Sequence, residues 1–319
     1  MNQESILRIL DEIEINISKI KNELNSKHEL EPKEKYEELI NKIKSIDYLK
    51  YRLINKYDEY DIFECIENAN KYPFLNEFID LYLSFNPDKV DKKNFCGETP
   101  LMVSFTLNNN METCKIILKH SPNLELKDKH NSTALFYACE IKNTDDLNNM
   151  IKLLLDMGAD YNTINNYNRT PLFRLCTNKY ANIDTYKMFL DKNIDINYKN
   201  KYNSVLNVFC LFNNNNPEII DLFKQYGYNF TIYDIDYMLE NKKYVFLKQI
   251  LSYYDNLDLI SNVKLVEFNN KPAKLIKVLY HLYFKNQIDE EIIKIAISKG
   301  AKKEDLIDDK KLVDFYKKL

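Results

Sequence analysis

Short apolar runs recur along the middle of the chain at a nearly constant interval. They lie at residues 116–118, 153–155, 188–190 and 219–223, and a segment with Gly or Asn follows each. Such residues end helices in a left-handed cap. A hydroxyl residue precedes each run, at Thr99, Thr133, Thr170 and Ser204, with intervals of 34, 37 and 34 residues. The pattern predicts units of turn, short helix, connector, second helix and cap, which is typical of a stacked-repeat solenoid.

The same units carry a recognisable motif. Gly97-Glu98-Thr99-Pro100-Leu101 opens one unit, Arg169-Thr170-Pro171-Leu172 opens another, and Gly158-Ala159-Asp160 closes the unit between them. This sequence resembles the ankyrin repeat, and residues 163–197 match it best. The resemblance implies an all-α fold with short β-hairpin fingers, an ankyrin-repeat α-solenoid. In that family Thr-Pro opens the inner helix, because Pro suits the first position and the Thr side chain caps backbone groups.

The sequence departs from the family at the residue after Thr-Pro-Leu. The family usually has His there, whereas this chain has Met102, Phe136, Phe173 and Asn207. We therefore expect the family's hydrogen bonding between adjacent fingers to be lost.

Residues 1–57 differ from the rest. A heptad seam runs through Ile6, Leu10, Ile13, Ile17, Ile20 and Leu24, and a second runs through Tyr36, Leu39, Ile43, Ile46, Leu49 and Leu53. Pro32 ends the break between them, since Pro disfavours a helix at the residue before it. Two interpretations stay open. The two helices form a coiled-coil-like hairpin docked on the first repeat, or residues 6–24 pair between chains in a homo-oligomer.

Residues 58–319 are predicted to form the solenoid. Residues 58–92 are a truncated N-terminal capping repeat, 93–230 are four clear repeats, and 231–319 are degenerate repeats with a C-terminal cap. Terminal repeats are expected to be atypical because one face meets water. The last segment, 302–319, is interpreted as a solvated cap. The alternative is an F-box-like segment that recruits a ubiquitin ligase, as in ankyrin proteins of some large DNA viruses.

Three of the six cysteines share one repeat position. Cys139, Cys176 and Cys210 lie 37 and 34 residues apart, where the family usually places a small buried Ala. We expect them to be packed in the core, because a free Cys behaves as a small hydrophobe. No C-x-x-C occurs, and Cys114, His120 and His130 have intervals that suit no standard metal site. The sequence therefore predicts no metal.

Composition argues against several function classes. The net charge of -3 and the absence of a basic run predict no binding to nucleic acid. The four glycines are far apart, so no phosphate-binding loop is expected, and we predict neither a cofactor nor catalysis. No stretch of about 18 apolar residues or secretory signal is evident, which favours no membrane contact and a cytoplasmic location, in the protein's own cell or in a host cell.

The resemblance indicates where a protein partner of unknown identity would bind. Ankyrin proteins usually grip partners with finger tips and the exposed start of the inner helix. Carrying these positions over gives, on the fingers, Phe95, Lys129, His130, Asn166, Tyr167, Arg169, Asn200, Lys201 and Tyr202. On the inner helices the same transfer gives Glu140, Thr177 and Leu211. The rival hypothesis is a homo-oligomeric scaffold in which residues 1–57 make the functional contact.

Overall fold

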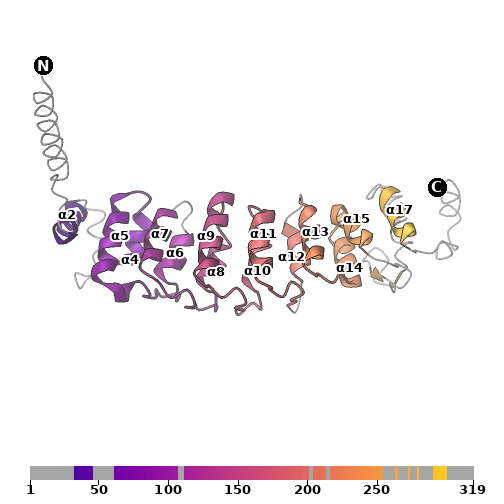
Figure 1. Ribbon diagram of the computed structural model, residues 1–319, viewed down its shortest axis with the longest axis horizontal. Helices are drawn as coiled ribbons and strands as arrows, with labels where there is room; N and C mark the ends of the chain where they lie inside the picture. Colours follow the sequence, from indigo (N-terminus) through magenta and orange to yellow (C-terminus); the bar gives the residue numbers. More distant parts are fainter. Residues whose placement is uncertain are drawn as a thin grey trace, which may run out of the picture.

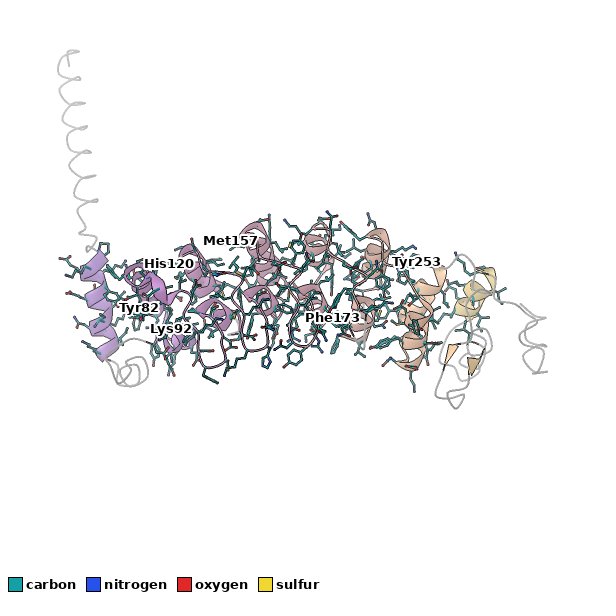
Figure 2. The ribbon with its side chains drawn as sticks, turned by 90° about the horizontal axis from the view of Figure 1, so that it is seen from below. Tyr82, Lys92, His120, Met157, Phe173 and Tyr253 are labelled. Atoms are coloured by element: carbon teal, nitrogen blue, oxygen red, sulfur yellow. The ribbon has the colours of Figure 1, made fainter. Side chains whose placement is uncertain are left out.

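The protein is a row of helical pairs, seen here in a computed structural model (Figure 1). The structure describes residues 32–45, 61–106, 111–200, 204–212, 216–253, 263–264, 272–273, 279 and 290–299. Inner and outer helices alternate along the chain and form two rows. Side chains fill the space between successive pairs along the whole row (Figure 2). Each pair therefore buries its apolar surface mainly against its neighbours, as in a solenoid.

The helix bounds follow the predicted units. The inner helices are α4 (Ile62–Asn68), α6 (Pro100–Thr106), α8 (Ala134–Ala138), α10 (Pro171–Leu175), α12 (Val205–Phe212) and α14 (Ile232–Glu240). The outer helices are α5 (Phe74–Phe85), α7 (Met111–Lys119), α9 (Thr144–Asp156), α11 (Ile183–Leu190), α13 (Glu218–Gln225) and α15 (Tyr244–Ser252). Each inner helix contacts the next inner helix from α4 to α14. The predicted helix-rich solenoid is confirmed.

Shorter elements complete the row. A 3-10 turn, η1 (Pro87–Lys89), follows α5, and α17 (Glu290–Ser298) packs on α15. Two-residue strands β1 (Val263–Lys264) and β2 (Pro272–Ala273) pair antiparallel, and β1 contacts α14. The sequence did not predict this pair of strands.

The outer helices end as the sequence predicted. Ser121, Gly158, Asn193 and Gly227 all have left-handed backbone conformations, with φ of 51°, 88°, 56° and 84°. Gly158 and Gly227 adopt this conformation without strain, and Asn tolerates it better than most residues. The predicted left-handed cap is present in all four units, and in the first it is Ser121 rather than a Gly or Asn.

Helix α2 (Pro32–Ser45) covers the first outer helix, α5. Leu39 and Ile43 are buried, and the Tyr36 ring stacks on Phe78 with centroids 5.4 Å apart. The second predicted seam is therefore the buried face of α2 as far as Ser45. The first seam, residues 6–24, and the remainder of the second lie outside the described residues.

The hydroxyl residues that open the inner helices differ in their bonding. Thr170 Oγ1 accepts a hydrogen bond of 3.2 Å from the N–H of Phe173, and Ser204 Oγ likewise accepts from Asn207. The Thr133 hydroxyl is buried and has no hydrogen-bond partner. The predicted capping is thus confirmed at Thr170 and is absent at Thr133, where the hydroxyl is buried without compensation.

We expect Thr170→Val to lower the free energy of unfolding by about 1 kcal/mol, since a helix cap is lost. Thr133→Val, which has the same shape change, is expected to leave it within about 0.5 kcal/mol or to raise it, because no bond is lost and a buried hydroxyl is removed. Urea unfolding followed by circular dichroism measures both. Equal losses in the two variants would contradict this account.

Candidate functional site

The fingers between repeats are tight turns with one shared construction. Each begins with an Asx residue, Asn94, Asp128 or Asn165, whose side-chain Oδ1 accepts hydrogen bonds from the N–H groups two and four residues later. The fourth residue is left-handed in every case, being Gly97, Asn131 or Asn168. The side chain of the first residue therefore closes the turn by hydrogen bonds to its main chain.

Adjacent fingers are joined by main-chain hydrogen bonds. The Lys129 N–H donates to the Cys96 carbonyl over 3.0 Å, and the Asn166 N–H donates to the His130 carbonyl over 2.9 Å. A Cβ on Gly97 would lie 3.0 Å from the Lys129 nitrogen, so glycine permits the close approach. The expectation that hydrogen bonding between adjacent fingers is lost was wrong. Main-chain groups make these bonds, and they need no particular side chain.

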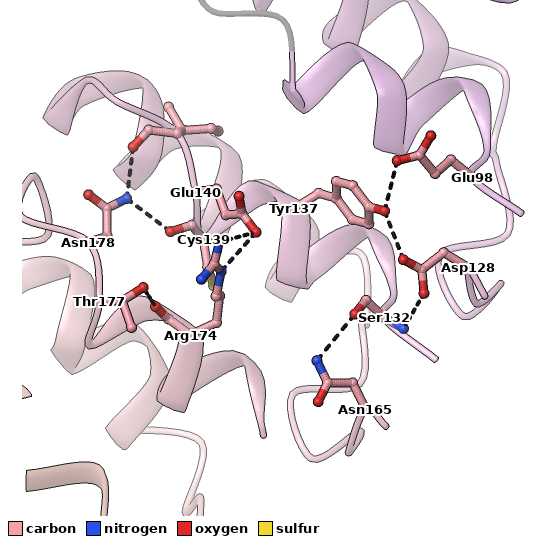
Figure 3. Close-up of polar contacts among 11 residues, drawn as sticks. Glu98, Asp128, Ser132, Tyr137, Cys139, Glu140, Asn165, Arg174, Thr177 and Asn178 are labelled. Carbon is pink, nitrogen blue, oxygen red and sulfur yellow. Dashed lines mark hydrogen bonds and ion pairs between the residues drawn. The ribbon is translucent and has the colours of Figure 1, made fainter. Parts of the chain in front are cut away.

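Tyr137 adds a second link between the first two fingers. Its hydroxyl lies 2.8 Å from Asp128 Oδ2 and 3.0 Å from Glu98 Oε1, and it can donate its proton to either carboxylate (Figure 3). Burial of the phenol, followed by its hydrogen bond to Asp128 and the nearby negative charges, raises the pKa of Tyr137 well above its usual value. The phenol therefore stays neutral and holds both acidic residues in the finger row.

The exposed tips form an aromatic and cationic group at the third finger. Tyr167 is 57% exposed, its ring lies 5.4 Å from the His130 ring, and its hydroxyl is 3.2 Å from His130 Nδ1. The Arg169 guanidinium lies 6.0 Å from the centre of the Tyr167 ring. These three side chains come from two fingers, and the main-chain links fix their spacing.

Two neighbouring hollows lie between the fingers and the inner helices. The first hollow, of about 230 Å³, is lined by Asp128, His130, Ser132, Phe136, Tyr137, Glu140, Asn165, Tyr167, Arg169 and Arg174. The second hollow, of about 770 Å³, is lined by Asn166, Tyr167, Asn168, Arg169, Phe173, Arg174, Thr177, Asn200, Val208, Leu211 and Phe212. Tyr167, Arg169 and Arg174 line both. We call this continuous surface the finger face.

Most of the predicted site residues lie on this face. His130, Glu140, Asn166, Tyr167, Arg169, Thr177, Asn200 and Leu211 line one or both hollows. Lys129 and Phe95 are exposed on the finger row but line neither hollow, and Phe95 is 85% exposed on the first finger. Lys201 and Tyr202 lie outside the described residues. The structure thus brings eight of the twelve residues together.

None of the three inner-helix residues lies at a helix start, where the sequence analysis placed them, and Leu211 is the last residue but one of α12. Helices α8 and α10 are only five residues long, so Glu140 and Thr177 lie in the turns after them. The helix starts are covered instead, since Leu135 and Leu172 are buried. The finger face therefore combines finger tips with the carboxyl ends of the inner helices.

The sequence analysis did not select several residues that line the hollows. Arg174 pairs with Glu140, with Nη2 and Nε lying 2.6 and 2.8 Å from Oε1 (Figure 3). Phe212 is 53% exposed beside Leu211 on α12. The Asx residues that build the fingers were also missed. Their positions, 94, 128 and 165, repeat at the same 34- and 37-residue intervals as the hydroxyl residues, and this period could have revealed them.

The cysteines and histidines that the structure describes do not gather into a site. Cys139, Cys176 and Cys210 are buried, as predicted. Cys114 lies 3.2 Å from the Ser104 hydroxyl, and His120 pairs with Asp80 over 2.8 Å. Among the residues that the structure describes, no group of three or more His, Cys, Asp or Glu side chains could hold a metal ion.

The stacked helical pairs, left-handed caps and linked fingers define a repeat solenoid. Residues 62–165 match the family model for ankyrin repeats, in three copies. The chain therefore contains ankyrin repeats. Beyond the matched range, helices α10 to α15 continue the same inner and outer alternation.

Known proteins similar to this chain include two viral ankyrin proteins. The chain is 28% identical over 229 residues to "Putative ankyrin repeat protein L371" of Acanthamoeba polyphaga mimivirus, which covers 69% of this chain and 28% of that protein. It is 27% identical over 123 residues to "Putative ankyrin repeat protein FPV222" of Fowlpox virus (strain NVSL), covering 38% and 16%.

A third similar protein has an enzyme name. The chain is 30% identical over 109 residues to the NAD-dependent deacetylase sir2B of Dictyostelium discoideum, covering 32% of this chain and 14% of that protein. The chain spans less than a third of the length of each of these three relatives. Within the described part of the chain, no helix has the length and apolar character needed to cross a membrane.

Proposed function

We propose that this chain is a non-catalytic interaction module that binds a protein partner through the finger face. Ankyrin repeats generally act as protein–protein interaction modules, and solenoids use extended surfaces of this kind for binding. The observation that carries the proposal is the second hollow. It is lined by exposed Tyr167 and Phe212 beside Arg169, and aromatic residues and Arg are enriched in protein interfaces. Exposed Leu211 lies next to Phe212 and adds apolar surface.

The geometry supports rigid presentation of this surface. Main-chain bonds link the finger that carries Lys129 to its neighbours on both sides, and Tyr137 links the first two fingers. A preorganised surface loses less conformational entropy when it binds. Tyr167 also supplies a large contact area with few rotatable bonds.

We expect the full chain to capture its partner in a pull-down and the full chain with Tyr167→Ala, Arg169→Ala to lose it. The matched control is Lys152→Ala, Met157→Ala, which removes one cation and one large exposed side chain around the end of outer helix α9. Truncation of central anchors weakens interfaces by about 2 kcal/mol or more each, whereas remote surface changes have little effect. Circular dichroism checks that both variants remain folded.

Retention of every partner by the Tyr167, Arg169 variant would contradict binding at the finger face. The N-terminal segment would then be the proposed site of the functional contact, and self-association through residues 6–24 would be the hypothesis to test. The suitable deletion is residues 1–31. Deleting 1–57 would also remove α2 and uncover Phe78 on α5.

We propose a cytoplasmic location, in the protein's own cell or in a host cell. The similarity to ankyrin proteins of two viruses supports the host-cell alternative. Fractionation of cells that express the tagged full chain tests it.

A further inference from the structure

The charges around the second hollow differ from those of the whole chain. The chain has a net charge of -3 and contains four arginines. Two of them, Arg169 and Arg174, line this hollow, and among the lining residues that the structure describes no other is charged. A positively charged surface on a protein with a negative net charge favours a partner that carries negative charge.

Arg169 is the more available of the two cations. It makes no ion pair with any residue that the structure describes, whereas Arg174 is already paired with Glu140. The Arg169 guanidinium lies near the Tyr167 ring, and such contacts orient its planar donors. An arginine at the edge of a hollow, without an ion-pair partner among the described residues, is suited to a carboxylate, which it can bind through two parallel hydrogen bonds.

The other wall of the hollow is apolar. Val208, Leu211 and Phe212 lie along α12, and Leu211 and Phe212 are 38% and 53% exposed. Leu211 and Phe212 are exposed side by side and give this wall an apolar surface that a ligand can cover. The cationic edge and this wall belong to one hollow, so a single ligand segment can contact both.

We propose that the occupant is an acidic, apolar segment of the protein partner. One large apolar side chain of the segment packs on Leu211 and Phe212, and a neighbouring Asp or Glu accepts hydrogen bonds from Arg169. The amide side chain of Asn168, which also lines the hollow, can bond to the backbone of the segment. This inference rests on the proposed function and specifies the chemistry of its partner.

The test is selection of random 16-residue peptides displayed on phage against the intact protein. Peptides that pair Asp or Glu with Leu, Ile, Phe or Met are expected to be enriched several-fold over the starting library. The best peptide, made synthetically with a fluorescent label, is expected to bind at least tenfold more weakly to Arg169→Gln and to Leu211→Ser, Phe212→Ser. The control Lys152→Gln, which removes one exposed cation from α9, should change affinity less than twofold.

A double-mutant cycle identifies the ion pair. Replacing the acidic residue of the peptide by its amide should weaken binding to the unmodified protein but have little further effect on Arg169→Gln. Enriched peptides without acidic residues, or equal weakening on both proteins, would overturn the inference. If such peptides still lose affinity for Leu211→Ser, Phe212→Ser, the finger face binds and only the partner chemistry is wrong. Peptides that bind all finger-face variants equally, or no enrichment, would also overturn it, and the former would contradict the proposed function as well.

Discussion

The free energy of unfolding is expected to fall by roughly 5–7 kcal/mol between pH 7.5 and pH 9.5. Five thiols, those of Cys65, Cys114, Cys139, Cys176 and Cys210, are buried. Burial raises the pKa of each of them, in Cys114 to about 11, because the thiolate cannot be solvated in the core. In the unfolded chain the same thiols have a pKa of about 8.5.

The sign follows from the protons that each state binds. Above about pH 8.5 the unfolded thiols release protons while the folded ones keep them, so alkali favours unfolding. The stabilisation is complete below the unfolded pKa and is lost as the pH rises towards the folded pKa. One pH unit above the unfolded pKa, each thiol contributes a loss of about 1.4 kcal/mol. Because unfolded tyrosines have a pKa of about 10, they contribute little at pH 9.5.

Urea unfolding under reducing conditions at the two pH values measures this loss. The informative comparison is the triple variant Cys139→Ala, Cys176→Ala, Cys210→Ala, which keeps a small apolar side chain at each position. The free energy of unfolding of this variant should fall by only about 2–3 kcal/mol between the two pH values, whatever its value at pH 7.5. If the free energy of unfolding falls equally in both proteins, Cys139, Cys176 and Cys210 do not cause the alkaline instability.

The repeat frame could be predicted because it depends on local chemistry. Left-handed residues such as Gly158 and Asn193 end the outer helices in the structure as they do in the sequence pattern. The recurrence of Cys139 and Cys176 at one repeat position likewise identified buried residues. In each case a side chain's type and its period were sufficient, without knowledge of what lies across the repeat boundary.

The contacts between repeats could not be predicted in this way. The expected loss of finger bonding treated one side chain as decisive, yet the Lys129 and Asn166 N–H groups make the links. Tyr137 meets Glu98, which is 39 residues away in the sequence, because of how the repeats stack. Sequence periodicity gives the position of a residue within its unit but does not give its neighbour in the next.

The finger face was located more accurately than it was described. The residues selected by the family resemblance include Tyr167, Arg169 and Leu211, which line one hollow. It did not give the lengths of the inner helices, so it placed Glu140, Thr177 and Leu211 at helix starts. It also omitted Phe212, which is exposed because α12 extends to that residue.

A large loss of stability is also expected from Phe209→Ala. Phe209 is fully buried on α12, and its ring contacts those of Tyr186, Phe223 and Phe246 at centroid distances of 5.7–5.9 Å. Removing a buried aromatic ring leaves a cavity and costs about 3–5 kcal/mol. Because each repeat contacts mainly its neighbours, hydrogen exchange should quicken mostly from α10 to α15.

Phe212→Ala provides the matched control for this loss. It removes the same ring from the same helix three residues later, where the side chain is 53% exposed. Its free energy of unfolding should change by less than about 0.5 kcal/mol, since little surface is uncovered. Urea unfolding distinguishes the two variants, and equal losses would mean that the ring cluster around Phe209 is not the core of these repeats. For partner binding the expectation is reversed. Phe212→Ala should leave the fold intact and weaken binding of the partner, because Phe212 is a proposed binding residue.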